Sequence, residues 1–313
     1  MVEIIYENPD WLSFFKSALE EINVEHRLNF IDEFELDVHQ PPDDIVYLNR
    51  VSPSSHTRGH SNAVIRGEQY LTHLQAFNRQ VINDVRTIDF EMSKVNQYQL
   101  LKRFGLGYPV TYFASEIDTL INLAERTPFP LLTKHNRSGK GLGIYKFDTM
   151  PELKDYLHSD KYEPSPDGIL LLQEYIKPLN DRITRVEILD GQLVYAFHSA
   201  TSQGFELCPA DACRIDAQKG GIAAAPDLSA VADSDTPLFN WIENFEHPIV
   251  SKYIDLCKFA GFDMAGIEFV QGENGAIYTY DINGTTNYSP DVERQSNHKA
   301  RRAFQEFIKR KAA

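Results

Sequence analysis

Residues 264–283 have the sequence MAGIEFVQGENGAIYTYDIN, which predicts a β-hairpin. The Asn-Gly pair at 274–275 suits the tight turn, because both residues tolerate the positive φ angles that two-residue turns require. Antiparallel pairing brings Glu268, near the start of one strand, towards Asp281 and Asn283 at the end of the other. Side chains two residues apart in a strand share a face, so Asp281 and Asn283 are expected to point the same way.

These three side chains predict a metal site. Two carboxylates and an amide oxygen that converge among apolar residues repel one another and lose their hydration unless a cation joins them. Oxygen donors without His or Cys favour Mg²⁺ or Mn²⁺ over zinc. A polar sheet face in contact with water is the simpler alternative, and the hairpin alone does not exclude it.

A glycine-rich segment, KHNRSGKGLG at 134–143, lies between strands predicted over 129–135 and 142–147. Glycines let backbone N–H groups converge on phosphate oxygens, and Lys134 and Lys140 add positive charge. The segment is not a P-loop, because a glycine follows Lys140 and no helix comes next. A phosphate-binding loop and a glycine hairpin with solvated lysines both fit this pattern.

Two further segments carry polar residues within predicted strands. The apolar strand over 169–176 contains Gln173 and Glu174, a pattern that also fits the edge of a sheet. Arg185 stands near the start of a strand over 184–189. An arginine there usually forms a surface ion pair, although its planar fork also matches the oxygens of a phosphoryl group. Each segment alone favours the structural interpretation.

The first 90 residues alternate short apolar strands with amphipathic helices, as in a small α/β lobe. A strand over 2–6 precedes a helix that Asp10 is expected to cap, and a strand over 45–48 leads into a polar loop over 49–60. Ligands in open α/β sheets bind beyond the carboxyl ends of strands. The loop is therefore a candidate substrate surface, and its polar side chains include Arg50, Arg58 and His60.

The remaining segments continue a mixed α/β pattern. The sequence predicts a helix from Ser93 to Gly105 and a second helix with a capping box at Ser115 and Asp118. A hairpin turn at Asp190-Gly191 precedes a strand over 192–198, and an irregular segment follows over 204–245. A helix over 248–260 and a basic amphipathic helix over 290–311 are the last predicted helices. A chain of 313 residues exceeds one compact domain, so two or three lobes are expected.

The composition narrows the class of protein. A net charge of −14 argues against nucleic acid as the main partner, because phosphate backbones require a basic face. No apolar run approaches the roughly 20 residues that span a bilayer, and the N-terminus shows no secretory signal. The three cysteines, Cys208, Cys213 and Cys257, are too few for a disulfide framework. Cys208 and Cys213 are interpreted as buried structural thiols. We expect a cytoplasmic protein without nucleic-acid or membrane partners.

The order of these segments along the chain resembles the ATP-grasp superfamily, particularly its RimK-like carboxylate–amine ligase branch. The resemblance covers about residues 90–290. It implies an α/β protein with α+β lobes and the ATP-grasp fold. The implied regions are a pre-ATP-grasp α/β domain over 1–90, a small lobe with the glycine-rich loop over 91–176, and a C-terminal lobe with the metal site over 177–313.

The resemblance also implies roles for the matching residues. Lys94 and Lys134 match the two lysines that contact ATP phosphates, and Arg185 matches an arginine that steadies the transferred phosphoryl group. Glu268, Asp281 and Asn283 match the magnesium ligands, with Mn²⁺ as an alternative ion. The other implied nucleotide contacts are Ser138, Gly139, Lys140 and Gly141 of the flexible loop, Gln173, Glu174, Tyr175 and Ile176 of the hinge strand that reads the adenine edge, and Asp181.

Two positions depart from the family pattern. Relatives often place a ribose-binding Asp where this chain has Ile183, so Asp181 or Glu174 is expected to contact the ribose. Relatives also have an arginine and an asparagine near the phosphates, where residues 204–213 read GFELCPADAC. The surroundings of the acyl phosphate, and with them the substrate class, are left open by this difference.

The resemblance implies a ligase that uses Mg-ATP to activate a carboxylate as an acyl phosphate, which an amine then captures. The carboxylate and the amine would belong to small molecules or peptides, and Asn287 and Tyr288 join Arg50, Arg58 and His60 as candidate substrate contacts. The family commonly forms dimers, so a homodimer is one expected arrangement. A kinase or phosphotransferase of the same fold is the first alternative. A nucleotide-binding regulatory protein is the second, although a sensor has less need of a full set of metal ligands.

Overall fold

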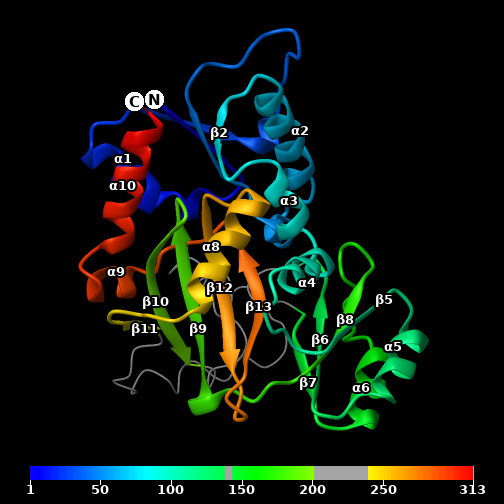
Figure 1. Ribbon diagram of the computed structural model, residues 1–313. Coiled ribbons are helices and arrows are strands. Elements are labelled where there is room, and N and C mark those ends of the chain that lie inside the picture. Colours follow the sequence, from blue (N-terminus) through cyan, green and yellow to red (C-terminus); the bar gives the residue numbers. More distant parts are fainter. Residues whose placement is uncertain (138–142, 201–238, 313) are drawn as a thin grey trace.

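A computed structural model describes residues 1–137, 143–200 and 239–312 of the chain. The described residues form three β-sheets with helices packed against them (Figure 1). The sheets follow one another along the chain and include residues 2–82, 111–174 and 182–283. Helices α3 (Arg86–Glu91) and α4 (Lys94–Arg103) connect the first sheet to the second.

The N-terminal sheet is parallel and has the strand order β2-β1-β3-β4. Its strands are β1 (Val2–Tyr6), β2 (His26–Phe30), β3 (Val46–Arg50) and β4 (Gln80–Ile82). Alternate residues of β1 enter different apolar clusters, because side chains in a strand alternate between faces. Ile4 joins the cluster of helix α1 (Ser13–Glu21), and Ile5 joins that of α2 (Ala63–Ala76).

The second sheet is antiparallel and has the order β5-β8-β6-β7. Its strands are β5 (Thr111–Ala114), β6 (Leu131–His135), β7 (Tyr145–Phe147) and β8 (Leu170–Glu174). Helices α5 (Ile117–Ala124) and α6 (Met150–Leu157) bury Leu120 and Leu153 against Leu131 of this sheet.

The third sheet has the order β11-β10-β9-β12-β13, and every pair of neighbours is antiparallel. Its strands are β9 (Arg182–Leu189), β10 (Gln192–Ala200), β11 (Phe239–Ile242), β12 (Met264–Gln271) and β13 (Ile277–Asn283). Helix α8 (Ile249–Ala260) covers one face and buries Tyr253 and Leu256 against Ile188.

The C-terminal helices return the chain to its beginning, so that the two termini lie side by side (Figure 1). Helix α9 (Pro290–Gln295) leads into α10 (Lys299–Lys311), which packs on α1. Phe304 meets Phe15 edge to face at 5.2 Å between ring centroids, and the Gln305 side-chain amide donates to the carbonyl oxygen of Ala18 at 3.1 Å.

Several predicted helix boundaries are wrong. Asn8, rather than Asp10, accepts the capping hydrogen bond, and it caps a 3₁₀ turn over Pro9–Trp11 before α1 begins. Helix α5 begins after Glu116 without a side-chain cap, so the capping box at Ser115 and Asp118 does not form. Both errors arise because short polar residues suit turns as well as helix caps.

The predicted helix over 290–311 is interrupted. Asn297 and His298 have φ angles of 53° and 58°, which a continuous right-handed helix does not allow. The chain therefore turns between α9 and α10. The polar segment over 49–60 is also more regular than predicted, because Asn49 and Arg50 complete β3 and Pro53–Arg58 forms a 3₁₀ helix.

Other elements match the sequence analysis. The 264–283 hairpin forms, Ser93 caps α4, and Asp190 and Gly191 adopt φ angles of 50° and 67° between β9 and β10. Part of the segment predicted to be irregular, Phe239–Ile242, forms strand β11, and 201–238 lie outside the described residues. None of the described helices is long and apolar enough to cross a membrane.

Candidate nucleotide and metal site

The β12–β13 hairpin brings the three predicted metal ligands to one end of the third sheet. Glu268 pairs in register with Asp281, and Asn283 pairs with Gly266. The side-chain amide of Asn283 donates to Oδ2 of Asp281 at 3.2 Å, so these two side chains do share a face. The three side chains together offer two carboxylates and an amide oxygen. Among the described residues no three His, Cys, Asp or Glu side chains are grouped so that they could hold a metal ion. The set formed by Glu268, Asp281 and Asn283 falls outside that criterion, because it contains two acids and one amide.

Two lysines from the neighbouring elements face this hairpin. Lys94, at the first position of α4, forms an ion pair with Asp281. Lys134 of β6 is buried, and its Nζ lies 5.0 Å from the ring centroid of Tyr280. Burial, followed by the charge of Lys134, lowers the pKa of Lys94 to about 7. Burial lowers the pKa of Lys134 to about 8, against the opposing effect of Glu268.

Gln97 fixes helix α4 on strand β13. Its side-chain nitrogen donates to the carbonyl oxygen of Ile282 at 2.9 Å, and its side-chain oxygen accepts from the Ile282 amide at 3.1 Å. Ile282 lies between Asp281 and Asn283, so this pair of hydrogen bonds holds Lys94 next to the predicted metal ligands. The link joins the ends of two elements that are far apart in the sequence.

Arg185 of β9 lies at the centre of a buried polar network. Its guanidinium donates at 2.7 Å each to Glu187, to Glu268 and to the hydroxyl of Thr286. Burial alone would lower the pKa of Arg185, but the two glutamates outweigh it and raise the pKa. The guanidinium passes directly over Gly266, where any Cβ would collide with it. A glycine is therefore required opposite Asn283.

The hinge strand β8 carries the next predicted nucleotide residues. Gln173 is buried, and its side-chain amide donates to Thr111 Oγ1 at 2.9 Å. Glu174 accepts from the Val110 amide at 2.8 Å, so its carboxylate is already engaged within the small lobe. Tyr175 and Ile176 follow the strand at partly exposed positions. Asp181 is exposed in the turn before β9, which leaves it the more accessible carboxylate for a ribose.

Some predicted positions lie outside the described residues. These are the loop residues Ser138, Gly139, Lys140 and Gly141, together with 204–213, which contain Cys208 and Cys213. The third cysteine, Cys257, is a buried free thiol in α8.

Three of the predicted substrate contacts lie together. Arg50, at the end of β3, is 1% exposed and donates from Nη2 to Asn287 Oδ1 at 2.8 Å and to the Thr285 carbonyl at 3.1 Å. Its Nε and Nη1 have no hydrogen-bond partner among the described residues. Burial lowers the pKa of Arg50 to about 10, while Tyr288, Glu91 and other acidic groups oppose that effect. The buried hydroxyl of Tyr288 likewise lacks a described partner.

The other two predicted substrate contacts have structural partners. Arg58 forms an ion pair with the buried Glu7, and its guanidinium carbon lies 4.4 Å from the ring centroid of Trp11. His60 contacts Asp32 at 2.5 Å, and Arg66 of α2 contacts the same carboxylate. His60 and Asp32 lie beside Arg66 of α2 and Phe30 of β2, whereas Arg50 lies against Phe15 of α1. The structure therefore does not bring His60 to Arg50.

The sequence analysis missed four polar residues that organise the site. They are Gln97, Glu187, Thr286 and Glu91. Glu187 was detectable, because it lies two residues from Arg185 and therefore on the same face of one strand. Thr286 and Gln97 gave no local signal, since their partners are 99 to 185 residues away in the chain. Burial raises the pKa of Glu91 to about 7, with Arg50 opposing it.

The chain is similar to known ATP-grasp proteins. The sequence model of the RimK-like ATP-grasp domain matches residues 92–228. A probable α-L-glutamate ligase of Shewanella loihica is 21% identical over 293 residues, which is 92% of this chain and 88% of the relative. The β-citrylglutamate synthase B of Danio rerio is 21% identical over 221 residues, which is 70% of this chain and 48% of that protein.

Solved structures share the fold along the whole chain. The ATP-grasp ligase PsnB, in a complex with a minimal precursor, Mg and ADP, superposes with a TM-score of 0.68 at 13% identity and covers 100% of this chain and 97% of its own. The D-alanyl-alanine synthetase A of Vibrio cholerae gives a TM-score of 0.66 at 12% identity, over 100% of this chain and 98% of that one. The chain therefore has the fold of the ATP-grasp ligases, and its residues 92–228, which include the two lysines that face the acidic hairpin, are similar to the RimK-like ATP-grasp domain.

Proposed function

We propose that the protein is an ATP-dependent carboxylate–amine ligase that forms an amide or peptide bond through an acyl phosphate. One observation carries the proposal: Lys94 of helix α4 and Lys134 of strand β6 face Asp281 and its hairpin, so positive charge and metal-binding oxygens border the same space. The relatives named as glutamate ligases and the ATP-grasp ligases of known structure support the reaction class.

The acidic hairpin fits a magnesium ion by its chemistry. Glu268 and Asp281 are each paired with a cationic side chain, Arg185 and Lys94, so both carboxylates lie where positive charge balances them. Glu268, Asp281 and Asn283 would hold Mg²⁺, and Mn²⁺ has the same ligand preference. When bound, the ion neutralises charge on the ATP phosphates during transfer.

The chain's own side chains then have separate tasks. Lys94 and Lys134, in their protonated form, supply positive charge to the phosphates, and Arg185 keeps Glu268 in place while adding charge near the transferred group. Gln173 to Ile176 are proposed as the adenine contacts and Asp181 as the ribose contact. The amides of Glu174 and Tyr175 already donate to the carbonyl oxygens of Val110 and Pro130, because β8 lies between β5 and β6. Ser138, Gly139, Lys140 and Gly141, which lie outside the described residues, are proposed as further nucleotide contacts. No nucleophile from the protein is needed.

The substrate contacts that we propose centre on Arg50. Its two unpartnered nitrogens, with Asn287 and Tyr288 beside it, suit an anionic substrate group such as a carboxylate. Arg58 and His60 have weaker support, because both already pair with carboxylates.

Several coarser features complete the proposal. We place the lobe boundaries near residues 90 and 176, between the three sheets. The substrates are a small-molecule or peptide carboxylate and an amine. A cytoplasmic location and a homodimeric state are proposed on the composition and on the habits of the family, respectively.

The decisive experiment measures ADP release by the wild type with Mg-ATP and a panel of amino acids and small peptides, followed by the mass of the product. Asp281→Asn is expected to abolish turnover and to retain part of the ATP binding, because it removes a metal ligand and leaves the lysines in place. Asp255→Asn, at an exposed position on α8, is the matched control and is expected to keep full activity. Wild-type turnover in Asp281→Asn would refute the metal assignment.

The same assay separates a ligase from a kinase. A ligase requires an amine for sustained ADP release, and its product is heavier by the amine minus water. A kinase releases ADP with one substrate, and its product carries a phosphoryl group. Hydroxylamine provides a further check, because it captures an acyl phosphate as a hydroxamate without any second substrate.

A further inference from the structure

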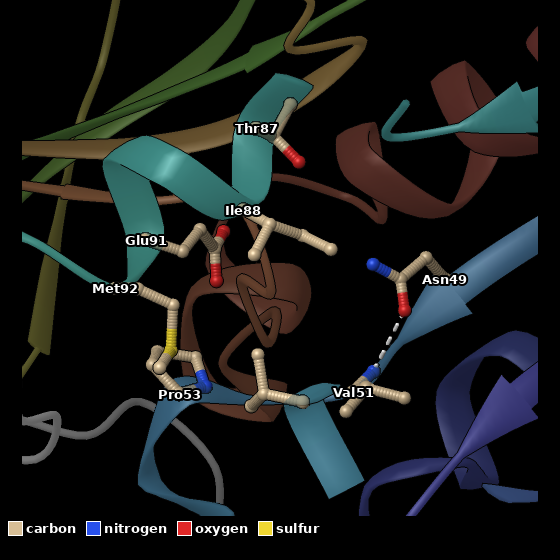
Figure 2. Close-up of a pocket in the computed structure, with 8 residues that line it drawn as sticks. Asn49, Val51, Pro53, Thr87, Ile88, Glu91 and Met92 are labelled. Atoms are coloured by element: carbon tan, nitrogen blue, oxygen red, sulfur yellow. Dashed lines mark hydrogen bonds between the residues drawn. The ribbon is translucent and has the colours of Figure 1, made fainter. Parts of the chain in front are cut away.

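Two side chains beside the β12–β13 hairpin take no part in the reaction proposed above. One is Glu91, at the edge of a hollow between the end of β3 and helix α3 (Figure 2). The hollow has room for about one water molecule, and Glu91 already accepts hydrogen bonds from the Thr285 hydroxyl and from the backbone of Gly284 and Thr285. Glu91 is therefore held by the protein itself. The other side chain is Tyr280, which lies between the hairpin and the small lobe.

Tyr280 is the extra residue of a β-bulge. Glu268 of β12 pairs with Asp281, and the next residue, Phe269, pairs with Thr279, so Tyr280 has no ladder partner on β12. A bulge changes the direction of a side chain relative to the regular alternation, and bulges are common next to active sites. Here the bulge stands directly beside two of the predicted metal ligands.

The neighbours of Tyr280 show which face of the sheet it occupies. The hydroxyls of Thr279 and of Tyr253 in α8 lie 2.7 Å apart, and Ile282 packs in the apolar cluster of that helix. Residues three apart in a regular strand point to opposite faces, so Thr279 and Ile282 can share the α8 face only because of the bulge. Tyr280 and Asp281, which lie between them, are left together on the other face.

On that face Tyr280 contacts both charged halves of the proposed site. The Nζ of Lys134 in β6 lies 5.0 Å from the centroid of its ring, a distance typical of a cation–π interaction. Arg185 donates to Oε1 of Glu268 at 2.7 Å. Burial, followed by the charge of Glu268 and a hydrogen bond to it, raises the pKa of the Tyr280 phenol. The hydroxyl therefore stays protonated and gives Glu268 a second donor.

We propose that Tyr280 is a positioning residue of the nucleotide and metal site, whose ring holds the Lys134 ammonium for the phosphates and whose hydroxyl orients Glu268 for the metal ion. The side chain is rigid, so it sets the spacing between a cationic and an anionic member of the site. Donors to a ligating carboxylate fix its orientation and thereby raise its affinity for the metal. The inference rests on the proposed ligase function and adds a residue to its site.

Calorimetric titration of the full chain with ADP, once in EDTA and once in excess Mg²⁺, separates the two contacts. The titration in EDTA reports the lysine side of the site, and the gain in affinity on adding Mg²⁺ reports the metal side. Tyr280→Phe keeps the ring and removes the hydroxyl. Its ADP affinity in EDTA should stay within about twofold of the wild type, whereas the gain from Mg²⁺ should fall about tenfold.

Tyr280→Leu removes the ring as well. Its ADP affinity in EDTA should fall about fivefold, because Lys134 loses the aromatic face that favours and fixes its charged form. Tyr278→Phe is the matched control. It removes a phenolic hydroxyl from the same strand, where that hydroxyl only accepts from the Asn274 side chain at 3.0 Å, and it should bind ADP as the wild type does in both titrations.

Two results would overturn the inference. One is a Tyr280→Phe variant that keeps the full gain from Mg²⁺. The other is a Tyr280→Phe variant whose ADP affinity in EDTA falls as far as that of Tyr280→Leu, because a general loss of structure would then explain both. If the wild type binds ADP more tightly with Mg²⁺ in either case, only the assignment of Tyr280 fails. A wild type that binds no ADP in either titration would instead overturn the ligase proposal.

Discussion

Two buried arginines of this protein have opposite surroundings. Arg185 donates to two glutamates and one threonine hydroxyl, and its charge is fully compensated. Arg50 is even less exposed, yet it donates only to neutral oxygens of Thr285 and Asn287, forms no ion pair with a described carboxylate and keeps two nitrogens without a described partner. The two guanidiniums reach neighbouring residues of one turn, because Thr286 follows Thr285.

The difference distinguishes an arginine that stabilises the fold from an arginine that can bind a ligand. A buried charge that has all its partners holds those partners in place, and its removal leaves them unpaired. A buried charge with unfilled hydrogen-bonding capacity stores a cost that an anionic ligand can relieve. Arg185 is therefore expected to govern the stability of the metal hairpin, whereas Arg50 is expected to govern substrate affinity.

Replacing Arg185 should have the largest effect. Arg185→Met leaves Glu187 and Glu268 as buried uncompensated carboxylates, so the free energy of unfolding is expected to fall by about 3–5 kcal/mol. Urea denaturation followed by circular dichroism measures this change. Arg182→Met, at the exposed start of the same strand, is the control and should lose little. A loss below about 1 kcal/mol for Arg185→Met would mean that the network is not a support.

Thr286→Val tests one hydrogen-bonding partner of Arg185 with almost unchanged shape. Its hydroxyl accepts from Arg185 and lies 2.9 Å from Glu187 Oε2. Hydrogen bonds to charged groups contribute about 1.5–3 kcal/mol, so the free energy of unfolding should fall within that range. Thr286→Ser keeps the hydroxyl and should recover most of it. Equal losses in the two variants would assign the effect to packing rather than to the hydroxyl.

Arg50→Met should affect stability less than either change and affinity more. The variant leaves neutral acceptors unsatisfied but also removes a buried charge that forms no ion pair with a described carboxylate, so a net change within about 1 kcal/mol is expected. The KM for the anionic substrate should rise about tenfold or more while the KM for ATP stays unchanged. Arg50→Lys keeps the charge and should recover part of the affinity. A stability loss as large as that of Arg185→Met, with an unchanged KM, would contradict the contrast between the two arginines.

The sequence predicted what depends on local patterns. Alternation and the Asn-Gly turn defined the 264–283 hairpin, and a serine before an apolar run defined the start of α4. The tip differs from a two-residue turn, because Gln271 pairs with Ile277 and only Gly275 of the Asn-Gly pair has a positive φ. A bulge between Glu268 and Phe269 then brings Glu268 opposite Asp281, so antiparallel pairing places Glu268, Asp281 and Asn283 together as the sequence predicts.

The parts that sequence reasoning missed depend on distant contacts. Nothing near Thr286 indicates Arg185, and nothing near Gln97 indicates Ile282, since these partners meet only after the sheets have packed. The break at His298 is also not encoded as a glycine or proline, so the amphipathic pattern of 290–311 concealed it. The sequence also could not indicate that Arg50, rather than Arg58, is buried without an ion-pair partner, because the two arginines differ only in their tertiary partners.

His60 gives the smallest expected effect and marks the outer limit of the recognition site. It pairs with Asp32 at a partly exposed position beside Arg66 of α2, and Arg66 can still neutralise that carboxylate after a substitution. His60→Gln is therefore expected to change the free energy of unfolding by no more than about 0.5 kcal/mol and to leave both KM values unchanged. Steady-state kinetics beside Arg50→Met measure this directly. A rise in the KM of His60→Gln that matches that of Arg50→Met would extend the substrate surface to His60 and helix α2. Buried charge without an anion would then no longer suffice to identify the site.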